Sequence, residues 1–264
     1  VGRESPELAE PGEAHPPALA PPTLAEAERS DRLILLVEDN PYNQRVIGQQ
    51  LNLLGYAVET AEDGREALPL WRTGRFALVL TDCHMPEMDG YELTRAIRAE
   101  EDAEGDGGRH TPIVAITADA MKGTEASCRA AGMDDYLAKP IQLHQLRGLI
   151  GKWLPASPEV SAKEVPDAEE ATREAEGKGE AIDRQALPNL LGPVEPAELV
   201  DYYQLFIDSF DETAAELLAA QAAGEIEEIA RLGHRLKSAA RTAGAQALAN
   251  CCLALETAAK TSDR

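Results

Sequence analysis

The sequence predicts a doubly wound α/β domain with a five-stranded parallel sheet, followed by an all-α helical bundle. Three observations lead to this prediction. Short apolar runs alternate with helix-forming segments through the first half of the chain, which is typical of a parallel sheet with crossover helices. Two stretches rich in proline and glutamate flank this half. After the second stretch, only helical periodicity remains.

The flanking stretches divide the chain. Residues 1–31 are acidic and proline-rich, so we expect a flexible tether there. Residues 155–181 have a similar composition and predict an acidic linker. The two folded units are then residues 32–154 and residues 182–264. Because the chain starts at Val1, we also expect it to be part of a longer protein.

Five apolar runs predict the strands, and each is followed by a predicted helix. The strands are expected at 33–37, 57–60, 77–80, 113–116 and 135–137. The helices are expected at 41–54, 64–72, 89–99, 120–131 and 141–153. Asn40 is a suitable N-cap for the first of these, with Pro41 at its first position. Residues 101–111 read as an acidic, glycine-rich loop.

The C-terminal unit predicts three further helices, at 197–222, 225–243 and 245–261. In the second helix, apolar residues recur every three or four positions and form one stripe. Short connections make these helices antiparallel neighbours in a bundle.

The composition limits the possible functions. The net charge is -22, from 25 Lys+Arg against 47 Asp+Glu, which argues against nucleic acid or an anionic membrane surface as the main partner. The cysteines (Cys83, Cys128, Cys251 and Cys252) lack metal-ligand spacing and indicate reduced thiols. No apolar run reaches the 18 residues or so that a membrane span needs, so we expect a cytoplasmic unit without direct membrane contact.

Polar side chains follow the predicted strands at one edge of the sheet. These are Glu38, Asp39, Asp82, Thr117 and Lys139. In a doubly wound sheet, the carboxyl ends of the strands form the site. Three neighbouring carboxylates repel one another, so a divalent cation would stabilise them, and oxygen ligands of this kind suit Mg²⁺. A carboxylate facing Mg²⁺, an ammonium and a hydroxyl can accept a phosphoryl group.

Four motifs, in this order, resemble the receiver domain of response regulators, which has a flavodoxin-like fold. They are Val-Glu-Asp-Asn at 37–40, Thr-Asp-Cys-His-Met-Pro-Glu-Met-Asp-Gly at 81–90, Ile-Thr-Ala at 116–118 and Tyr-Leu-Ala-Lys-Pro at 136–140. The resemblance implies that Asp82 is the phosphoacceptor. It implies that Asp39 binds Mg²⁺ directly, that Glu38 binds it through water, and that the backbone carbonyl of His84 completes the ligands.

The same resemblance assigns roles to three more residues. Thr117 would bind the phosphoryl group and signal the switch, and Lys139 would bind the phosphoryl oxygens. Tyr136 would be the aromatic side chain that moves inward on activation. The His84 side chain itself is expected to be an ordinary surface residue.

His234 is the second candidate site. It lies about 100° around the predicted helix from Gly233 on the apolar stripe. Its neighbours Arg231, Lys237 and Arg241 predict a basic, solvent-facing strip, which would favour the neutral, nucleophilic imidazole. Lys237 could then pair with phosphoryl oxygens.

This segment resembles the histidine-phosphotransfer (Hpt) motif His-x-Leu-Lys-Gly, with Ser238 in place of the usual glycine. The family bundle normally has one more helix than the residues after His234 supply, so we expect an incomplete bundle. An Hpt-like unit after a receiver is the arrangement at the C-terminus of bacterial hybrid sensor histidine kinases of the BvgS/EvgS type. The parent would then be anchored in the inner membrane, and this part would lack the kinase catalytic domain.

The resemblance implies a two-component phosphorelay module. Asp82 would accept a phosphoryl group from an upstream histidine kinase and exchange it with His234, which would pass it to the receiver of a downstream response regulator. The alternative is a docking or scaffold switch, controlled by phosphorylation, without a working Hpt histidine. A metal-dependent phosphatase is disfavoured, because His84 stands where such enzymes need a second acid.

Overall fold

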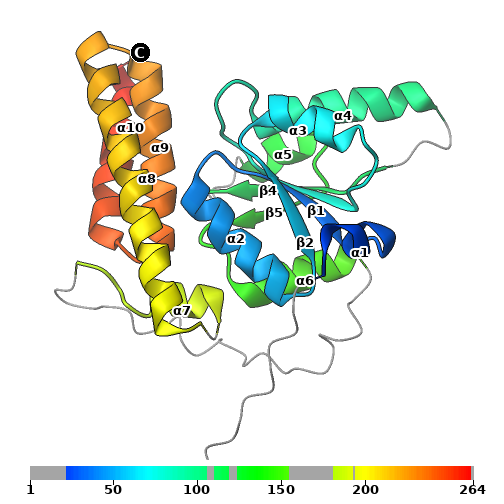
Figure 1. Cartoon of the computed structure of the whole chain (residues 1–264). Coiled ribbons are helices and arrows are strands. Elements are labelled where there is room, and N and C mark those ends of the chain that lie inside the picture. Colours follow the sequence, from blue (N-terminus) through cyan, green and yellow to red (C-terminus); the bar gives the residue numbers. More distant parts are fainter. Residues whose placement is uncertain (1–21, 106–109, 119–123, 155–180, 193, 263–264) are drawn as a thin grey trace, which may run out of the picture.

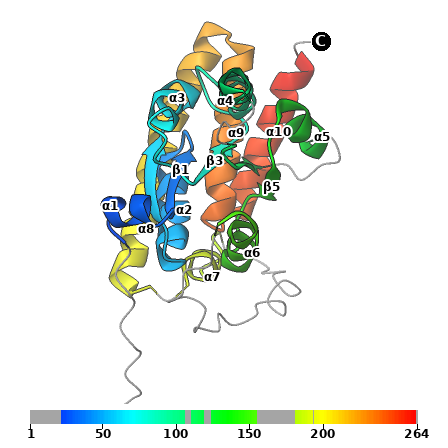
Figure 2. The same cartoon turned by 90° about the vertical axis from the view of Figure 1, so that its right-hand side faces the viewer.

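The computed structural model describes residues 22–105, 110–118, 124–154, 181–192 and 194–262. It confirms the predicted fold class. A five-stranded parallel sheet in the order β2-β1-β3-β4-β5 is followed by a helical unit that lies beside it (Figures 1 and 2).

The sheet strands are short, and the central ones are fully buried. Their bounds are β1 Leu33–Val37, β2 Ala57–Ala61, β3 Leu78–Asp82, β4 Ile113–Thr117 and β5 Asp135–Ala138. All five residues of β1, β3 and β4 are buried, which agrees with their continuous apolar patterns. β3 extends two residues beyond the predicted end, so Thr81 and Asp82 lie in the strand itself.

Helices cover both faces of the sheet. α2 (Pro41–Leu53) and α6 (Leu143–Trp153) pack on one face, while α3 (Gly64–Trp71), α4 (Gly90–Glu104) and α5 (Thr124–Ala131) pack on the other. The N-cap expected at Asn40 is present, because its side chain accepts hydrogen bonds from the backbone N–H groups of Tyr42 and Asn43. α4 continues into the segment that was predicted to be loop. The predicted helical residues 120–123 lie outside the described part of the chain.

The prediction of one flexible tether over residues 1–31 is wrong at its C-terminal end. Leu24–Arg29 form a helix, α1, which starts with a capping box between Thr23 and Glu26. Ala27 on this helix is fully buried in the core beside β1 and β2. Proline density therefore ends at Pro22, and the alanine- and glutamate-rich segment after it can fold against the sheet.

The helical unit contains α7 (Ala186–Leu191), α8 (Pro196–Ala223), α9 (Ile226–Thr242) and α10 (Gln246–Ser262). The three long helices agree with the predicted ones to within one residue. Gly224 ends α8 in the left-handed conformation, with φ of 75°. α9 contacts both α8 and α10. The short helix α7 was not predicted.

The two units pack against each other through α2. This helix contacts α7, α8 and α9, which lie along it in Figure 1. The contact has an apolar core in which Tyr42 and Val46 of the receiver-like unit meet Leu187, Tyr202 and Phe206 of the helical unit. No helix in the described part of the chain is long and apolar enough to cross a membrane.

Candidate functional site

An acidic cluster lies at the carboxyl edge of the sheet. Glu38 and Asp39 follow β1, and Asp82 ends β3, the strand next to it. Carboxylate oxygens of the three residues lie within 4.8 Å of one another, and all three side chains are buried. This set of hard oxygen donors fits a divalent cation such as Mg²⁺.

Lys139 neutralises part of this charge. Its buried Nζ donates to Glu38 Oε2 at 2.6 Å and also to Asp82. Asn43 of α2 donates a second hydrogen bond to Glu38, at 2.9 Å. Among the receiver's own side chains at this site, one ammonium faces three carboxylates, which leaves negative charge to attract a cation.

Burial and neighbouring charges shift the pKa values of the three carboxyl groups in different directions. Burial, followed by repulsion from Glu38 and Asp82, raises the pKa of Asp39 to about 7. Burial also raises the pKa of Glu38. Burial acts in the same direction on Asp82, but attraction by Lys139 and then by His234 outweighs it and lowers the pKa of Asp82. Asp82 is therefore the member of the cluster whose ionised form its surroundings favour.

Thr117 and His84, two other predicted receiver residues, lie at the same edge. Thr117 ends β4 and is buried, and its carbonyl accepts a hydrogen bond from the Lys139 backbone N–H at 2.7 Å. The His84 backbone N–H donates to Asp82 Oδ1 at 3.1 Å. Tyr136 on β5 is half-buried, and its hydroxyl donates to Glu125 of α5 at 3.5 Å.

The prediction that His234 faces solvent is wrong. His234 lies on α9, is only 7% exposed and faces the acidic edge of the sheet. Its ring packs edge-to-face on the ring of His84, with centroids 5.1 Å apart and an interplanar angle of 76°. Of the predicted basic strip, Arg231 and Arg241 face the receiver-like unit, whereas Lys237 is buried inside the helical unit against α10. Helical periodicity gives the polar face of a helix without saying what packs on it.

Glu256 on α10 is a residue of this site that sequence reasoning missed. Its Oε1 lies 3.0 Å from Nδ1 of His234, while its Oε2 accepts a hydrogen bond from Lys237 at 2.7 Å and its Oε1 another from Lys260 at 2.5 Å. Burial opposes ionisation, but the bonds from these three groups hold the pKa of Glu256 well below its usual range. The sequence held one signal for Glu256, which is its place on the same face of α10 as Ala249, Cys252 and Ala259. All three of these residues are buried.

Lys237 also differs from its prediction. It is fully buried and paired with Glu256, rather than exposed and available to solvent. Nδ1 of His234 is thus oriented by a carboxylate, whereas its Nε2 is buried and has no hydrogen-bond partner within the described residues. Nε2 is the ring nitrogen left for chemistry.

Two arginines of α9 extend toward the acidic cluster. Arg231 Nη1 lies 3.7 Å from Asp39 Oδ2, and Arg235 Nε lies 3.8 Å from the same oxygen. Further along the helix, Arg241 donates to the Ala118 carbonyl at 2.9 Å. The helical unit therefore brings positive charge to the negative edge of the sheet, which is the complementarity expected of docking partners.

Comparison with known protein families identifies a separate family for each of the two units. The model of the response regulator receiver domain matches residues 34–151, and that of the Hpt domain matches residues 201–264. Residues 34–151 therefore belong to the receiver family and residues 201–264 to the Hpt family. Both matches confirm the family resemblances predicted from the motifs.

Two curated relatives match nearly the whole chain. The virulence sensor protein BvgS of Bordetella bronchiseptica is 35% identical over 257 residues, which cover 92% of this chain and 20% of BvgS. The sensor histidine kinase GacS of Pseudomonas protegens is 32% identical over 243 residues, which cover 87% of this chain and 24% of GacS. The chain therefore spans about a fifth to a quarter of the length of these curated relatives.

Solved structures match the receiver domain. The receiver domain of the sensor histidine kinase PA1611 from Pseudomonas aeruginosa, described with a magnesium ion in its active site cleft, is 44% identical. The match covers 46% of this chain and 96% of that one, with a TM-score of 0.41.

Proposed function

We propose that this chain is a phosphorelay module in which a phosphoryl group moves between Asp82 of the receiver and His234 of the Hpt domain. The observation that carries the proposal is the docked arrangement: α9 presents His234 to the buried acidic cluster that contains Asp82. The orientation of the ring by Glu256 leaves Nε2 as the nucleophile.

In the transfer, the lone pair of His234 Nε2 attacks phosphorus, and the bond from phosphorus to the Asp82 carboxylate oxygen breaks. Asp82 regains its carboxylate, and Nδ1 of His234 keeps its proton toward Glu256. The phosphorylated ring then carries positive charge, which the Glu256 carboxylate stabilises. Transfer in the opposite direction uses the same contacts.

Three residues would support the phosphoryl group on the receiver. The Lys139 ammonium pairs with its oxygens, the Thr117 hydroxyl hydrogen-bonds to it, and Tyr136 moves inward with Thr117 as the switch. Glu38, Asp39, Asp82 and the His84 carbonyl would hold Mg²⁺, which when bound neutralises charge on the transferring group. Lys237 supports the phosphoryl group through Glu256 and His234 rather than by direct pairing.

The partners follow from the chemistry and from the relatives. We propose that an upstream histidine kinase domain in the same parent protein loads Asp82, and that a separate response regulator receives the phosphoryl group from His234. BvgS and GacS are named as sensor proteins, and their similarity to this chain supports this order. A cytoplasmic position beneath a membrane-anchored parent agrees with it.

The test is phosphorylation by a small phosphodonor with Mg²⁺, with the label divided by its stability in acid and in base. Wild type, Asp82→Asn, His234→Gln and the control His144→Gln, at an exposed position of α6, are compared. We expect Asp82→Asn to remove all label, His234→Gln to remove only the base-stable label, and the control to match wild type.

The outcomes separate the two functions considered for the chain. Label on Asp82 that never reaches His234 would support a docking switch without a working Hpt histidine. Absence of label from both residues, even with a phosphorylated kinase as donor, would refute the phosphorelay function.

A further inference from the structure

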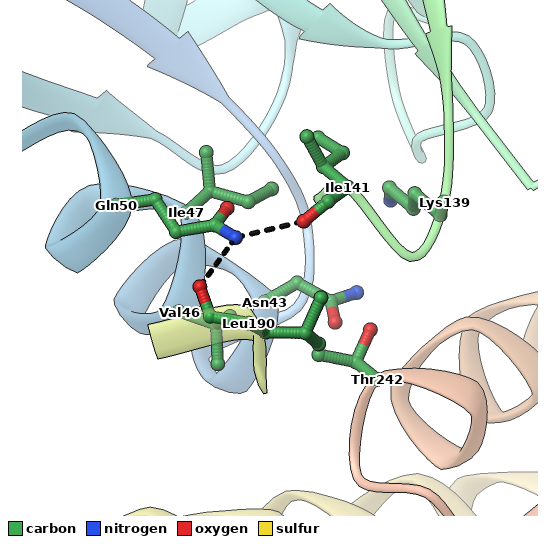
Figure 3. A pocket seen from close by; sticks show the side chains of 8 residues that line it. All are labelled: Asn43, Val46, Ile47, Gln50, Lys139, Ile141, Leu190 and Thr242. Atoms are coloured by element: carbon green, nitrogen blue, oxygen red, sulfur yellow. Dashed lines mark hydrogen bonds between the residues drawn. The ribbon is translucent and has the colours of Figure 1, made fainter. Parts of the chain in front are cut away.

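Gln50 of α2 connects the two domains through a single side-chain amide. It is fully buried, and its Nε2 donates to the Ile141 carbonyl at 2.7 Å and to the Leu190 carbonyl at 2.8 Å (Figure 3). Ile141 belongs to the receiver, whereas Leu190 lies on α7 at the start of the helical unit. Both acceptors are carbonyl oxygens, so the amide nitrogen must face them.

On the receiver side, Gln50 holds the turn that carries Lys139. Ile141 is two residues after Lys139, whose ammonium binds Glu38 and Asp82. Lys139 and Gln50 border the same small cavity, which Asn43 also lines (Figure 3). A shift of the Ile141 carbonyl would therefore move the backbone next to the phosphoacceptor site.

On the Hpt side, Gln50 holds α7. Leu187 and Leu191 of this helix are fully buried and share a core cluster with Val46 of α2 and with Ala239 and Ala240 of α9. Apolar contacts of this kind attract the two surfaces but permit sliding, whereas a hydrogen bond to one backbone carbonyl fixes the register. The Leu190 carbonyl would lose this buried bond if α7 moved along α2.

Within the described residues, the amide makes no hydrogen bond besides these two. Within the described residues, its Oε1 has no hydrogen-bond partner, so its orientation depends on the two bonds that its nitrogen donates. Removal of either acceptor would thus weaken the hold on the other.

We propose that Gln50 is a positioning residue that sets the register of the Hpt domain on the receiver and ties this docking to the Lys139 turn. The proposal rests on the proposed phosphotransfer. Because the second acceptor belongs to α7, Gln50 favours the chain's own Hpt domain over an Hpt domain that presents no such carbonyl.

The test compares Gln50→Met with Gln49→Met in the full chain. Both substitutions exchange an amide for an apolar side chain of similar length on α2, and Gln49 is a half-buried neighbour. The chain is loaded with a small phosphodonor and Mg²⁺, the donor is removed, and the movement of label from Asp82 to His234 is followed. We expect Gln50→Met to slow this step about tenfold, which corresponds to about 1.4 kcal/mol, and Gln49→Met to leave it as in wild type.

Hydrogen exchange supplies a second result that does not depend on phosphorylation. In Gln50→Met, amides of α7 and of the turn after Lys139 should lose protection together, while those of the α9–α10 pair keep it. A loss of protection throughout the chain would show only general destabilisation and would overturn the proposal.

An unchanged transfer rate in Gln50→Met, with α7 still protected, would also overturn it. Failure of the proposed function is distinguishable, because the wild-type chain itself would then pass no label from Asp82 to His234.

Discussion

Glu256 provides the sharpest test of how the Hpt histidine is held. Its carboxylate is 3% exposed and binds one imidazole and two ammonium groups. Glu256→Gln keeps the shape but removes the charge, so the fully buried Lys237 loses its ion pair with this carboxylate. Loss of one partner of a buried ion pair costs about 3–5 kcal/mol, and the remaining amide oxygen should offset part of this. We therefore expect the free energy of unfolding to fall by about 2–3 kcal/mol at pH 7.

The pH dependence of this loss has a defined sign. The pKa of Glu256 in the folded protein is held below its ordinary value of 4.5, so its ionised form stabilises the fold above that pH. This contribution decreases as the pH falls below 4.5 toward the folded pKa. The difference between wild type and Glu256→Gln should therefore narrow in acid.

Urea unfolding of both proteins at pH 7 and at about pH 3.5 measures this difference, with Glu227→Gln at an exposed position of α9 as the control. The variant should also transfer label to His234 at least tenfold more slowly, because the ring is no longer oriented. Equal stability of Glu256→Gln and wild type at pH 7, or a difference that does not change with pH, would refute the reasoning.

Three further predictions concern the contacts between the domains and the phosphoacceptor site. Arg235→Ala should tighten Mg²⁺ binding about threefold or more by calorimetry, because a guanidinium 3.8 Å from Asp39 repels the cation. Substitution of an arginine far from the acidic cluster should leave the Mg²⁺ affinity unchanged. His84→Ala should slow transfer to His234 several-fold in the labelling assay while leaving loading by a small donor intact, because only the ring contact is lost. Gly90→Ala should cost at least about 2 kcal/mol in urea unfolding, since its new Cβ would lie 2.1 Å from the carbonyl at the end of β3.

Local patterns explain what the sequence could predict. The apolar runs of the strands and the polar residues at their ends are set by a few neighbouring residues, and parallel topology brings those ends together without further information. The positions of Asp82 and Lys139 at one edge follow from this rule, and the structure brings them into direct contact.

What could not be predicted depends on contacts between distant segments. α7 is too short for a helical period, and it is stabilised by packing on α2. The burial of His234 requires knowledge that a second domain covers α9, and the pairing with Glu256 joins residues on two different helices. Similarly, α1 is short and gains its stability from the core beneath Ala27.

The burial of Asp82 has a consequence for the order of events. In the docked arrangement Asp82 is 3% exposed and Glu38 is fully covered, so under the proposed function a kinase histidine would reach the phosphoacceptor only after the segments that cover it had moved away. The Hpt domain would then both receive the phosphoryl group and block access to Asp82, which supplies it. Under that function, each turnover would alternate between an open receiver that faces the kinase and a closed one that faces its own Hpt domain. Stronger docking would speed delivery and slow reloading, so the flux through the module should be greatest at an intermediate docking strength.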